Sequence, residues 1–213
     1  MIIKEAKTSI EKLKVYRLRY EVYVEDFDKS FIKGIHNEYH LITDEFDEKG
    51  YSLYAEDKNG RFIGTLRISF FNNGEPNNFH ASYPIPKSIR RYVVVDRFAV
   101  TKNNRSSVIA MQLAKMIYKK ALQQGVYLCL IESPPKLLKL YEKMGFIRFQ
   151  TITKYGGLKR YLLFLNLLDA THLATINSPF LPILNQHIES ISQPFKGTSL
   201  NDNNHQFRLQ SAK

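Results

Sequence analysis

Two arginines and two aspartates have the residue types and positions to do chemistry. Arg67 and Arg97 each lie inside an apolar run of strand-forming residues. A guanidinium is rarely placed there without a partner, because moving an unpaired charge out of water is costly. The two arginines either pair with Asp44 and Asp47 in a structural ion pair, or bind a substrate carboxylate through paired hydrogen bonds. The aspartates could instead hold a substrate ammonium group, or belong to a polar turn at residues 47–50.

The net charge of the 213-residue chain is +11. After residue 165 the positive and negative side chains cancel, so the excess lies on the preceding part. A basic surface favours an acidic partner, such as a phosphorylated cofactor, an acidic carrier protein or an anionic membrane. No nucleic-acid-binding motif accompanies the charge, so we expect no nucleic-acid partner. A basic composition that only supports solubility remains the alternative.

Other residue types exclude several classes of protein. Cys129 is the single cysteine, so no disulfide forms within the chain. The six histidines show no metal-ligand spacing, so we predict no metal site. No apolar stretch approaches the ~20 residues of a membrane span, and no signal peptide is visible. These features predict a cytoplasmic protein, for which peripheral membrane contact stays open.

The elements that must position these side chains follow from the hydrophobic pattern. Helices are predicted after an N-cap at Ser9, from Ser106 or Ser107 to Gly125, and from Pro134 to Gly145. Residues 25–50 and 72–90 show no sustained period. The predicted strands are residues 2–7, 51–57, 61–71, 92–100, 126–133, 146–155 and 160–167, with hairpin turns at Asn59-Gly60 and Gly156-Gly157. This order predicts a mixed α+β fold around a central sheet.

The character of the chain changes near its C-terminal end. Residues 169–190 have the pattern of a broken amphipathic helix, and the residues after 192 are polar and rich in Gln and Asn. We therefore predict a main domain at residues 1–167, a helical appendage at 168–191 and a disordered tail at 192–213.

The order of elements resembles the GNAT superfamily, the Gcn5-related N-acyltransferases, and the segment LYEKMGF (140–146) is similar to one of its motifs. The resemblance implies an α/β/α sandwich whose mixed, mainly antiparallel sheet is splayed between its fourth and fifth strands. It also implies that a donor phosphate binds at the start of the helix after the fourth strand, here Arg105, Ser106 and Ser107. An ordinary helix cap would use the same residues.

Four shorter motifs are similar to those of acyl-homoserine-lactone synthases and long-chain N-acyl amino acid synthases. They are RYEVY (19–23), DEFD (44–47), GTLR (64–67) and DRFAV (96–100). This resemblance implies an acyl-pantetheine thioester as co-substrate, with acyl carrier protein or acyl-CoA as the carrier, a small amine or amino acid as acceptor, and no tightly bound cofactor. An acidic carrier protein would suit the positive net charge.

The motifs imply roles for individual residues. Tyr141 would protonate the leaving thiolate, unless it is a core tyrosine, and backbone N–H groups near Phe98, Ala99 and Val100 would stabilise the oxyanion. The predicted catalytic residues are Asp44, Asp47, Arg67, Asp96, Arg97 and Tyr141. The predicted substrate contacts are Arg19, Tyr23, Phe46, Phe98, Ala99 and Val100.

Two positions depart from the family patterns. Val108 stands where coenzyme A users carry a glycine, which disfavours tight coenzyme A binding. Val94 stands where the synthases carry a glutamate, often proposed to help deprotonate the amine. Asp96 or Asp44 would then take that task, or the amine would arrive neutral, or the protein would be inactive.

The sequence as a whole predicts an N-acyltransferase that moves a medium- or long-chain acyl group to an amine. The alternatives are an acetyl-CoA-dependent acetyltransferase and a degenerate domain that binds acyl ligands or docks a partner through residues 169–190.

Overall fold

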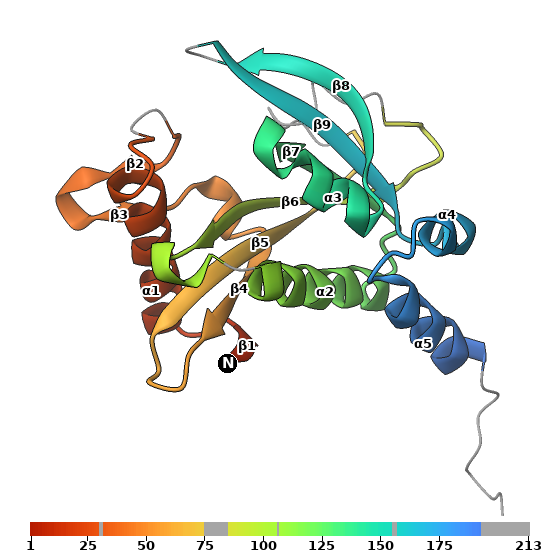
Figure 1. The fold of residues 1–213 in the computed structure, drawn as a ribbon, viewed down its shortest axis with the longest axis horizontal. Coiled ribbons are helices and arrows are strands. Elements are labelled where there is room, and N and C mark those ends of the chain that lie inside the picture. Colours follow the sequence, from red (N-terminus) through yellow and green to blue (C-terminus); the bar gives the residue numbers. More distant parts are fainter. Residues whose placement is uncertain (30–31, 75–84, 106, 155–156, 193–213) are drawn as a thin grey trace, which may run out of the picture.

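A seven-stranded sheet forms the centre of the molecule, with helices on both of its faces (Figure 1). The computed structural model describes residues 1–29, 32–74, 85–105, 107–154 and 157–192. The strands of the main sheet are β1 (Ile2–Glu5), β4 (Gly50–Glu56), β5 (Phe62–Asn72), β6 (Arg91–Val100), β7 (Leu128–Ser133), β8 (Ile147–Lys154) and β9 (Leu158–Asn166). The helices are α1 (Ser9–Tyr20), α2 (Ser107–Gln123), α3 (Leu138–Met144), α4 (Ala170–Thr175) and α5 (Leu181–Ser192).

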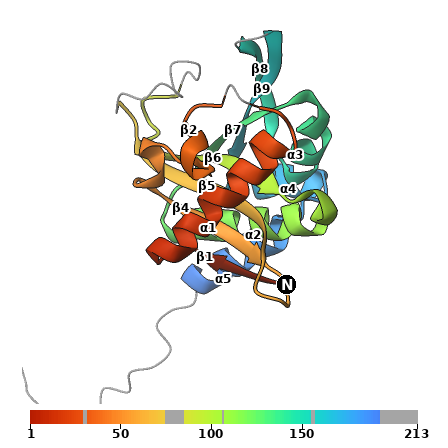
Figure 2. The same cartoon turned by 90° about the vertical axis from the view of Figure 1, so that its left-hand side faces the viewer.

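The helices divide the core into two layers. Val15 of α1 packs with Tyr54 on one face of the sheet, and Leu113 of α2 packs with Leu53 on the other. Successive residues of a strand point to opposite faces, so neighbouring β4 residues serve different layers. Figure 2 shows α1 across the near face of the sheet. The predicted α/β/α sandwich is confirmed.

The sheet order is β1-β4-β5-β6-β7-β9-β8. All neighbouring strands are antiparallel except β6 and β7, which run parallel. Their register holds only two pairs, Val93 with Cys129 and Val94 with Leu130. Beyond these pairs the two strands diverge, which confirms the predicted splay and opens a gap between the halves of the sheet.

The helix ends mostly follow the predicted signals. The exception is α1, whose N-cap is Thr8 and not Ser9. The Thr8 hydroxyl accepts the Glu11 N–H at 3.2 Å, and the Glu11 carboxylate accepts the Thr8 N–H at 2.9 Å. These reciprocal bonds form a capping box, which outweighs the preference of Ser9 for the same position. Helix α2 begins at Ser107, and the preceding residue, Ser106, lies outside the described part of the chain.

The segment predicted to be irregular between residues 25 and 50 contains short regular elements. A π-helical turn (Glu21–Glu25) extends α1, and β2 (Ile35–His36) pairs with β3 (Leu41–Ile42). A 3₁₀ turn (Glu45–Asp47) follows. These elements are only two to five residues long, too short to leave a hydrophobic period in the sequence.

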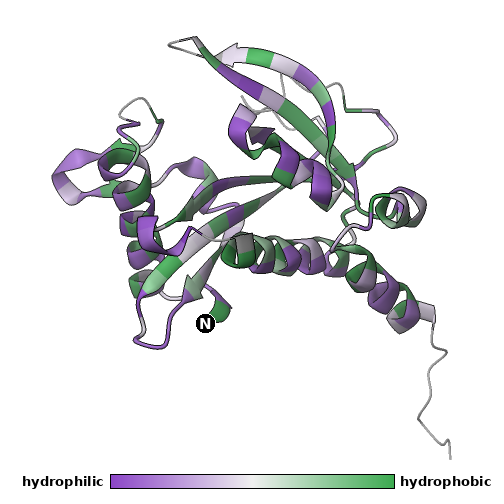
Figure 3. Cartoon of the chain, viewed as in Figure 1, coloured by the Kyte–Doolittle hydropathy of each residue, from purple (hydrophilic) through white to green (hydrophobic). Residues whose placement is uncertain are grey.

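The C-terminal helices α4 and α5 confirm the predicted broken helix, with the break at residues 176–180. Leu173, Phe180 and Leu184 are buried in the same cluster as α2. In Figure 3 both α2 and α5 carry hydrophobic and hydrophilic residues, as a helix that covers a core must. The predicted tail and the predicted turn at Gly156 lie outside the described residues. No helix within the described ranges is long and apolar enough to cross a membrane.

Candidate active site

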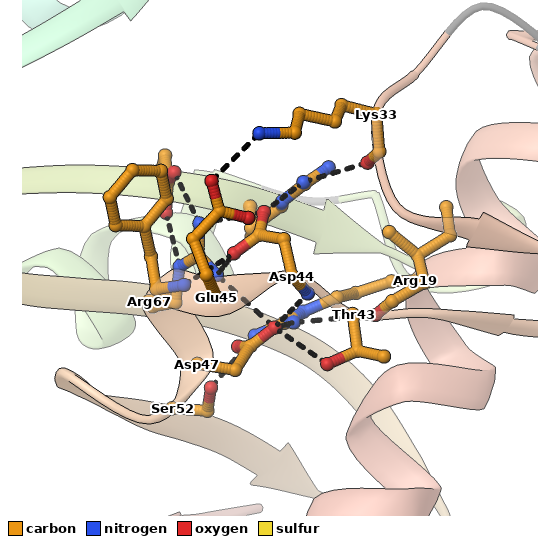
Figure 4. Close-up of polar contacts among 12 residues, drawn as sticks. Arg19, Lys33, Thr43, Asp44, Glu45, Asp47, Ser52 and Arg67 are labelled. Atoms are coloured by element: carbon orange, nitrogen blue, oxygen red, sulfur yellow. Dashed lines mark hydrogen bonds and ion pairs between the residues drawn. The ribbon is translucent and has the colours of Figure 1, made fainter. Parts of the chain in front are cut away.

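Arg67 is the centre of a buried ion-pair network on the α1 face of the sheet (Figure 4). Its guanidinium donates to both oxygens of Asp96, from Nε at 2.8 Å and from Nη2 at 2.7 Å. Nη1 donates to Oδ1 of Asp44 at 2.5 Å and lies 3.1 Å from Oδ2 of Asp47. The side chain is 1% exposed. The predicted pairing of Arg67 with the two aspartates is therefore present.

Arg19 extends this network from α1. It is fully buried, and its Nη1 contacts the two oxygens of Asp47 at 2.8 and 3.0 Å. Nη2 donates to the Ser52 hydroxyl at 2.7 Å. Arg19 had been predicted to touch substrate. In the structure its guanidinium is occupied by Asp47 and Ser52 beneath the site, so it supports the residues above it.

The 3₁₀ turn that follows β3 aims the carboxylates. Asp44 caps the turn by accepting the Phe46 N–H at 3.0 Å, and Asp47 accepts the Asp44 N–H at 3.0 Å and the Thr43 hydroxyl at 3.1 Å. The Phe46 ring covers Arg67, with its centroid 5.8 Å from the guanidinium carbon. This short turn and its cap thus fix the carboxylates of Asp44 and Asp47 and hold the Phe46 ring over Arg67.

The ion pairs set the charge of the network. Burial opposes ionisation of Asp44, but Arg67 and Arg97 outweigh it and hold its pKa well below the usual range. Burial likewise opposes ionisation of Asp47, whose pKa is lowered by Arg19 and Arg67. Burial acts to lower the pKa of Arg67, and its carboxylate partners raise it overall. All these groups are therefore charged at neutral pH.

Arg97 lies at a β-bulge in β6 and has a φ of +54°. Arg67 pairs with Asp96, and Thr65 pairs with Ala99, so one β5 residue opposes two in β6. A bulge interrupts the ladder and turns its backbone groups away from the neighbouring strand. The Arg97 guanidinium donates to the Lys33 carbonyl at 2.9 Å and to Asp44. Among the predicted catalytic residues, Arg97 thus joins the network at the point where β6 leaves its regular register.

The diverging strands enclose a cleft of about 930 Å³ on the other side of β6. Phe98, Ala99, Val100, Tyr23 and Arg105 line it, as predicted for substrate and donor contacts. The Tyr23 hydroxyl donates to the Phe98 carbonyl at 2.7 Å, and burial raises the pKa of Tyr23 to about 12. The cleft therefore meets the bulge of β6.

Five cations line the cleft, and the sequence predicted only Arg105 among them. The others are Lys29, Lys136, Lys159 and Arg160. Burial lowers the pKa of Lys29, and the charges of Arg160, Lys136 and Arg105 lower it further. Arg105 pairs with Asp26 at 2.6 Å and stacks 4.2 Å from the Phe27 ring. These lysines and arginines come from four separate segments, so no sequence motif could reveal the cluster.

A small inner cavity of about 40 Å³ adjoins the cleft. Phe98, Ala110 and Leu140 line both spaces. Tyr141 lies in the wall of the inner cavity, in edge contact with Phe146 at 5.7 Å between ring centroids, and burial raises its pKa. The structure thus places Tyr141 beside the cleft and on the opposite side of β6 from the arginine network.

The position of the expected glutamate is apolar. Val94 is 3% exposed and packs with Tyr92 and Leu130. Asp96 follows two residues later, so it lies on the same face. Glu132 of β7 lies two residues after Leu130 and shares that face too. Sequence reasoning missed Glu132. Its place on this face becomes visible only with the parallel register of β6 and β7, which pairs Val94 with Leu130.

Val108, which stands where coenzyme A users carry a glycine, is 59% exposed in the first turn of α2. A side chain there occupies the space through which a phosphate would approach the helix backbone. Within the described ranges, no group of three or more His, Cys, Asp and Glu residues is placed to hold a metal ion.

A sandwich whose parallel strand pair splays beside a bulge, with a cationic cleft near the splay, has the GNAT type of fold. A family model described as N-acyl amino acid synthase FeeM matches residues 14–167. The chain belongs to this family and is an N-acyltransferase.

Solved structures with the same fold agree with this membership. FeeM, an N-acyl amino acid synthase from uncultured soil microbes, superposes with a TM-score of 0.64 at 15% identity, covering 85% of this chain and 96% of its own. The acyl-homoserine-lactone synthase LasI gives 0.63 at 18% identity, covering 83% and 95%. The CoA-dependent acyl-homoserine lactone synthase BjaI gives 0.60 at 15% identity, covering 88% and 97%. No curated protein sequence matches the chain.

Proposed function

We propose that this N-acyltransferase moves a medium- or long-chain acyl group from the pantetheine thioester of an acyl carrier protein to the amine of an amino acid or related molecule. The observation that carries the proposal is the cleft at the C-terminal ends of β6 and β7. Cations line it, apolar side chains continue inward, and a charged network lies across β6. These three regions suit a phosphate with its pantetheine arm in the cleft, the end of an acyl chain in the inner cavity and an amino acid at the network.

The acyl donor binds in the cationic cleft. Lys29, Lys136, Arg160 and Arg105 attract the single phosphate of a pantetheine arm. The positive net charge attracts an acidic carrier. Val108 disfavours the larger pyrophosphate of coenzyme A at the start of α2, which supports the carrier protein over acyl-CoA.

The acceptor enters on the arginine side. Arg97 is partly exposed and binds its carboxylate. Asp44 and Asp47 have lowered pKa values and are weak bases, so they hold the arginines in place and accept no proton. Asp96 is 28% exposed in its side chain and takes the amine proton, with Glu132 as the second carboxylate on that face.

The proposed reaction uses groups on both sides of β6. The amine nitrogen attacks the thioester carbonyl, and backbone N–H groups at the bulge stabilise the oxyanion. The C–N bond forms and the C–S bond breaks. The amine proton goes to Asp96, and the leaving thiolate takes a proton from Tyr141, which its raised pKa keeps protonated at neutral pH.

The test is mass spectrometry of lipid extracts from a bacterial host that expresses the protein, compared with an Asp96→Asn variant. A new N-acyl amino acid or acyl lactone that the variant does not make would support the proposal and name both substrates. If the folded wild-type protein makes no such lipid, and its purified form transfers no acyl group from acyl carrier protein to amino acids, the proposal fails. Acyl-CoA of the same chain length serves as the comparison donor.

A further inference from the structure

The inner end of the apolar cavity is closed by a side chain from outside the family-matched region. Phe180 lines the cavity and comes from the break between α4 and α5, beyond residue 167. Figure 1 shows these helices in blue at the C-terminal end of α2. The remaining lining comes from α2, α3, β5, β6, β7, β9 and the residues that flank them.

Phe180 is held in place from several sides. Its ring is 1% exposed and stacks on Tyr118 with centroids 4.4 Å apart and an interplanar angle of 14°. The Tyr118 hydroxyl donates to the Leu167 carbonyl at 2.5 Å. The Ser178 hydroxyl donates to the Met144 carbonyl at 2.7 Å and accepts the Phe180 N–H at 3.2 Å. The ring is therefore a fixed wall of the cavity.

The cavity is apolar and small. Its α2 wall carries three alanines, Ala110, Ala114 and Ala121, beside Ile117 and Tyr118, and the alanines leave room that larger side chains would fill. The volume of about 40 Å³ is far below the ~150 Å³ of an engineered apolar cavity that binds benzene, so it takes only the terminal carbons of an acyl chain whose remainder lies in the cleft. An acyl chain that enters past Phe98 and Leu140 therefore runs out of space at the stacked Phe180 and Tyr118 rings.

We infer that Phe180 sets the upper limit of acyl-chain length, with the methyl end of the chain against its ring. This inference rests on the proposed function, because it assumes that the cleft binds an acyl thioester. Small residues on α2 give the chain its path, and the C-terminal helices supply its end. A segment outside the family-matched residues thus selects among substrates of the same chemical class.

The experiment measures kcat/KM for a series of saturated acyl thioesters of increasing length, with one acceptor. Phe180→Ala lengthens the cavity, and it should raise the ratio of long-chain to short-chain kcat/KM by at least about tenfold. Ala121→Leu fills the same cavity and should shift the profile to shorter chains. Leu184→Ala is the matched control, because Leu184 is fully buried in the same helical segment but does not line the cavity. Its profile should equal that of the wild type.

Phe180→Leu replaces Phe180→Ala if the alanine variant fails to fold, which thermal unfolding detects. An active Phe180 variant and an active Ala121→Leu variant that both keep the wild-type profile would overturn the inference while the proposed function stands. An equal shift in Leu184→Ala would also overturn it, since the effect would then be general loosening. A wild-type protein that turns over no chain length would remove the proposed function, and this inference with it.

Discussion

The arginine network on one side of β6 and the cationic cleft on the other side use charge in opposite ways. In the network, Arg19, Arg67 and Arg97 are matched by Asp44, Asp47 and Asp96 within a few ångströms. In the cleft, five cations gather, and Arg105 is the one that forms an ion pair among the described residues. The network's charges match one another, and only Arg97 and Asp96 are partly exposed to a ligand, whereas the cleft concentrates positive charge that an anion would neutralise.

The difference separates structural roles from binding roles. Oppositely charged side chains that pair in a buried site fix its geometry, and removing one of them lowers the free energy of unfolding. Charges that repel one another in an open cleft cost stability, and their benefit comes when a ligand binds. Substitutions on the two sides should therefore change different quantities, and four measurements can break or sharpen this contrast.

The largest expected effect is on the folded state. Asp47→Ala leaves Arg19 and its charge buried without a carboxylate, so it should lower the free energy of unfolding by about 3–5 kcal/mol. Glu45→Ala is the matched control, because Glu45 is in the same 3₁₀ turn but pairs with Lys33 on the surface. Its loss should leave the free energy of unfolding nearly unchanged, because an exposed ion pair contributes little to stability. Urea unfolding measures both, and equal losses would contradict the assignment of Asp47 to a buried framework.

The next effect is on the chemical step. Asp96→Asn keeps the size of the side chain but removes the proposed base, so kcat should fall by about 100-fold or more. Glu132→Gln is measured beside it under the same conditions. If Glu132→Gln lost the rate and Asp96→Asn kept it, the base would be assigned to β7 instead of β6.

A smaller effect is expected at the cleft. Lys136→Ala combined with Arg160→Ala removes two cations that have no ion pair among the described residues, so KM for the acyl donor should rise about tenfold. The free energy of unfolding should stay within about 0.5 kcal/mol of the wild-type value. The rise in KM should shrink at high salt, since screening weakens the attraction in the wild type. An unchanged KM would show that the donor phosphate does not use these residues.

The smallest effect is the pH dependence of stability. The folded-state pKa of Asp47 is depressed by Arg19 and Arg67, after burial has opposed it. Its stabilisation is therefore fully present above the unfolded pKa, about 4, and is lost as pH falls through the folded pKa. As the pH falls below 4, the wild type should lose stability more steeply than Asp47→Asn. Urea midpoints at a series of acidic pH values test this, and parallel curves would contradict it.

The sequence predicted the fold well because its signals are local. Runs of apolar and β-branched residues marked each strand of the main sheet, and Gly125 and Gly145 marked helix ends. The N-cap of α1 was misplaced by one residue, since Thr8 gained a reciprocal bond with Glu11 that Ser9 could not match.

The site was predicted in part. Arg67 and Arg97 stood out as charges in apolar strands, so their aspartate partners could be expected. The cleft cations Lys29, Lys136 and Arg160 could not be predicted, because their proximity depends on how three distant segments meet. Phe180 had no chemical signature, and its place in the cavity follows from the packing of the C-terminal helices on α2.

The packing around Gly145 has a consequence for how the chain folds as it is synthesised. Gly145 has a φ of +112°, and a Cβ there would lie 2.7 Å from a methyl carbon of Leu173. His172 bonds the Gly145 carbonyl at 2.9 Å, and Leu184 is fully buried in the same cluster as the strands. The ribosome must therefore have released residue 184 before the hydrophobic core, which includes both Leu53 and Leu184, can be completed. Until then the exposed apolar surface of α2 and α3 is open to chaperones and to aggregation.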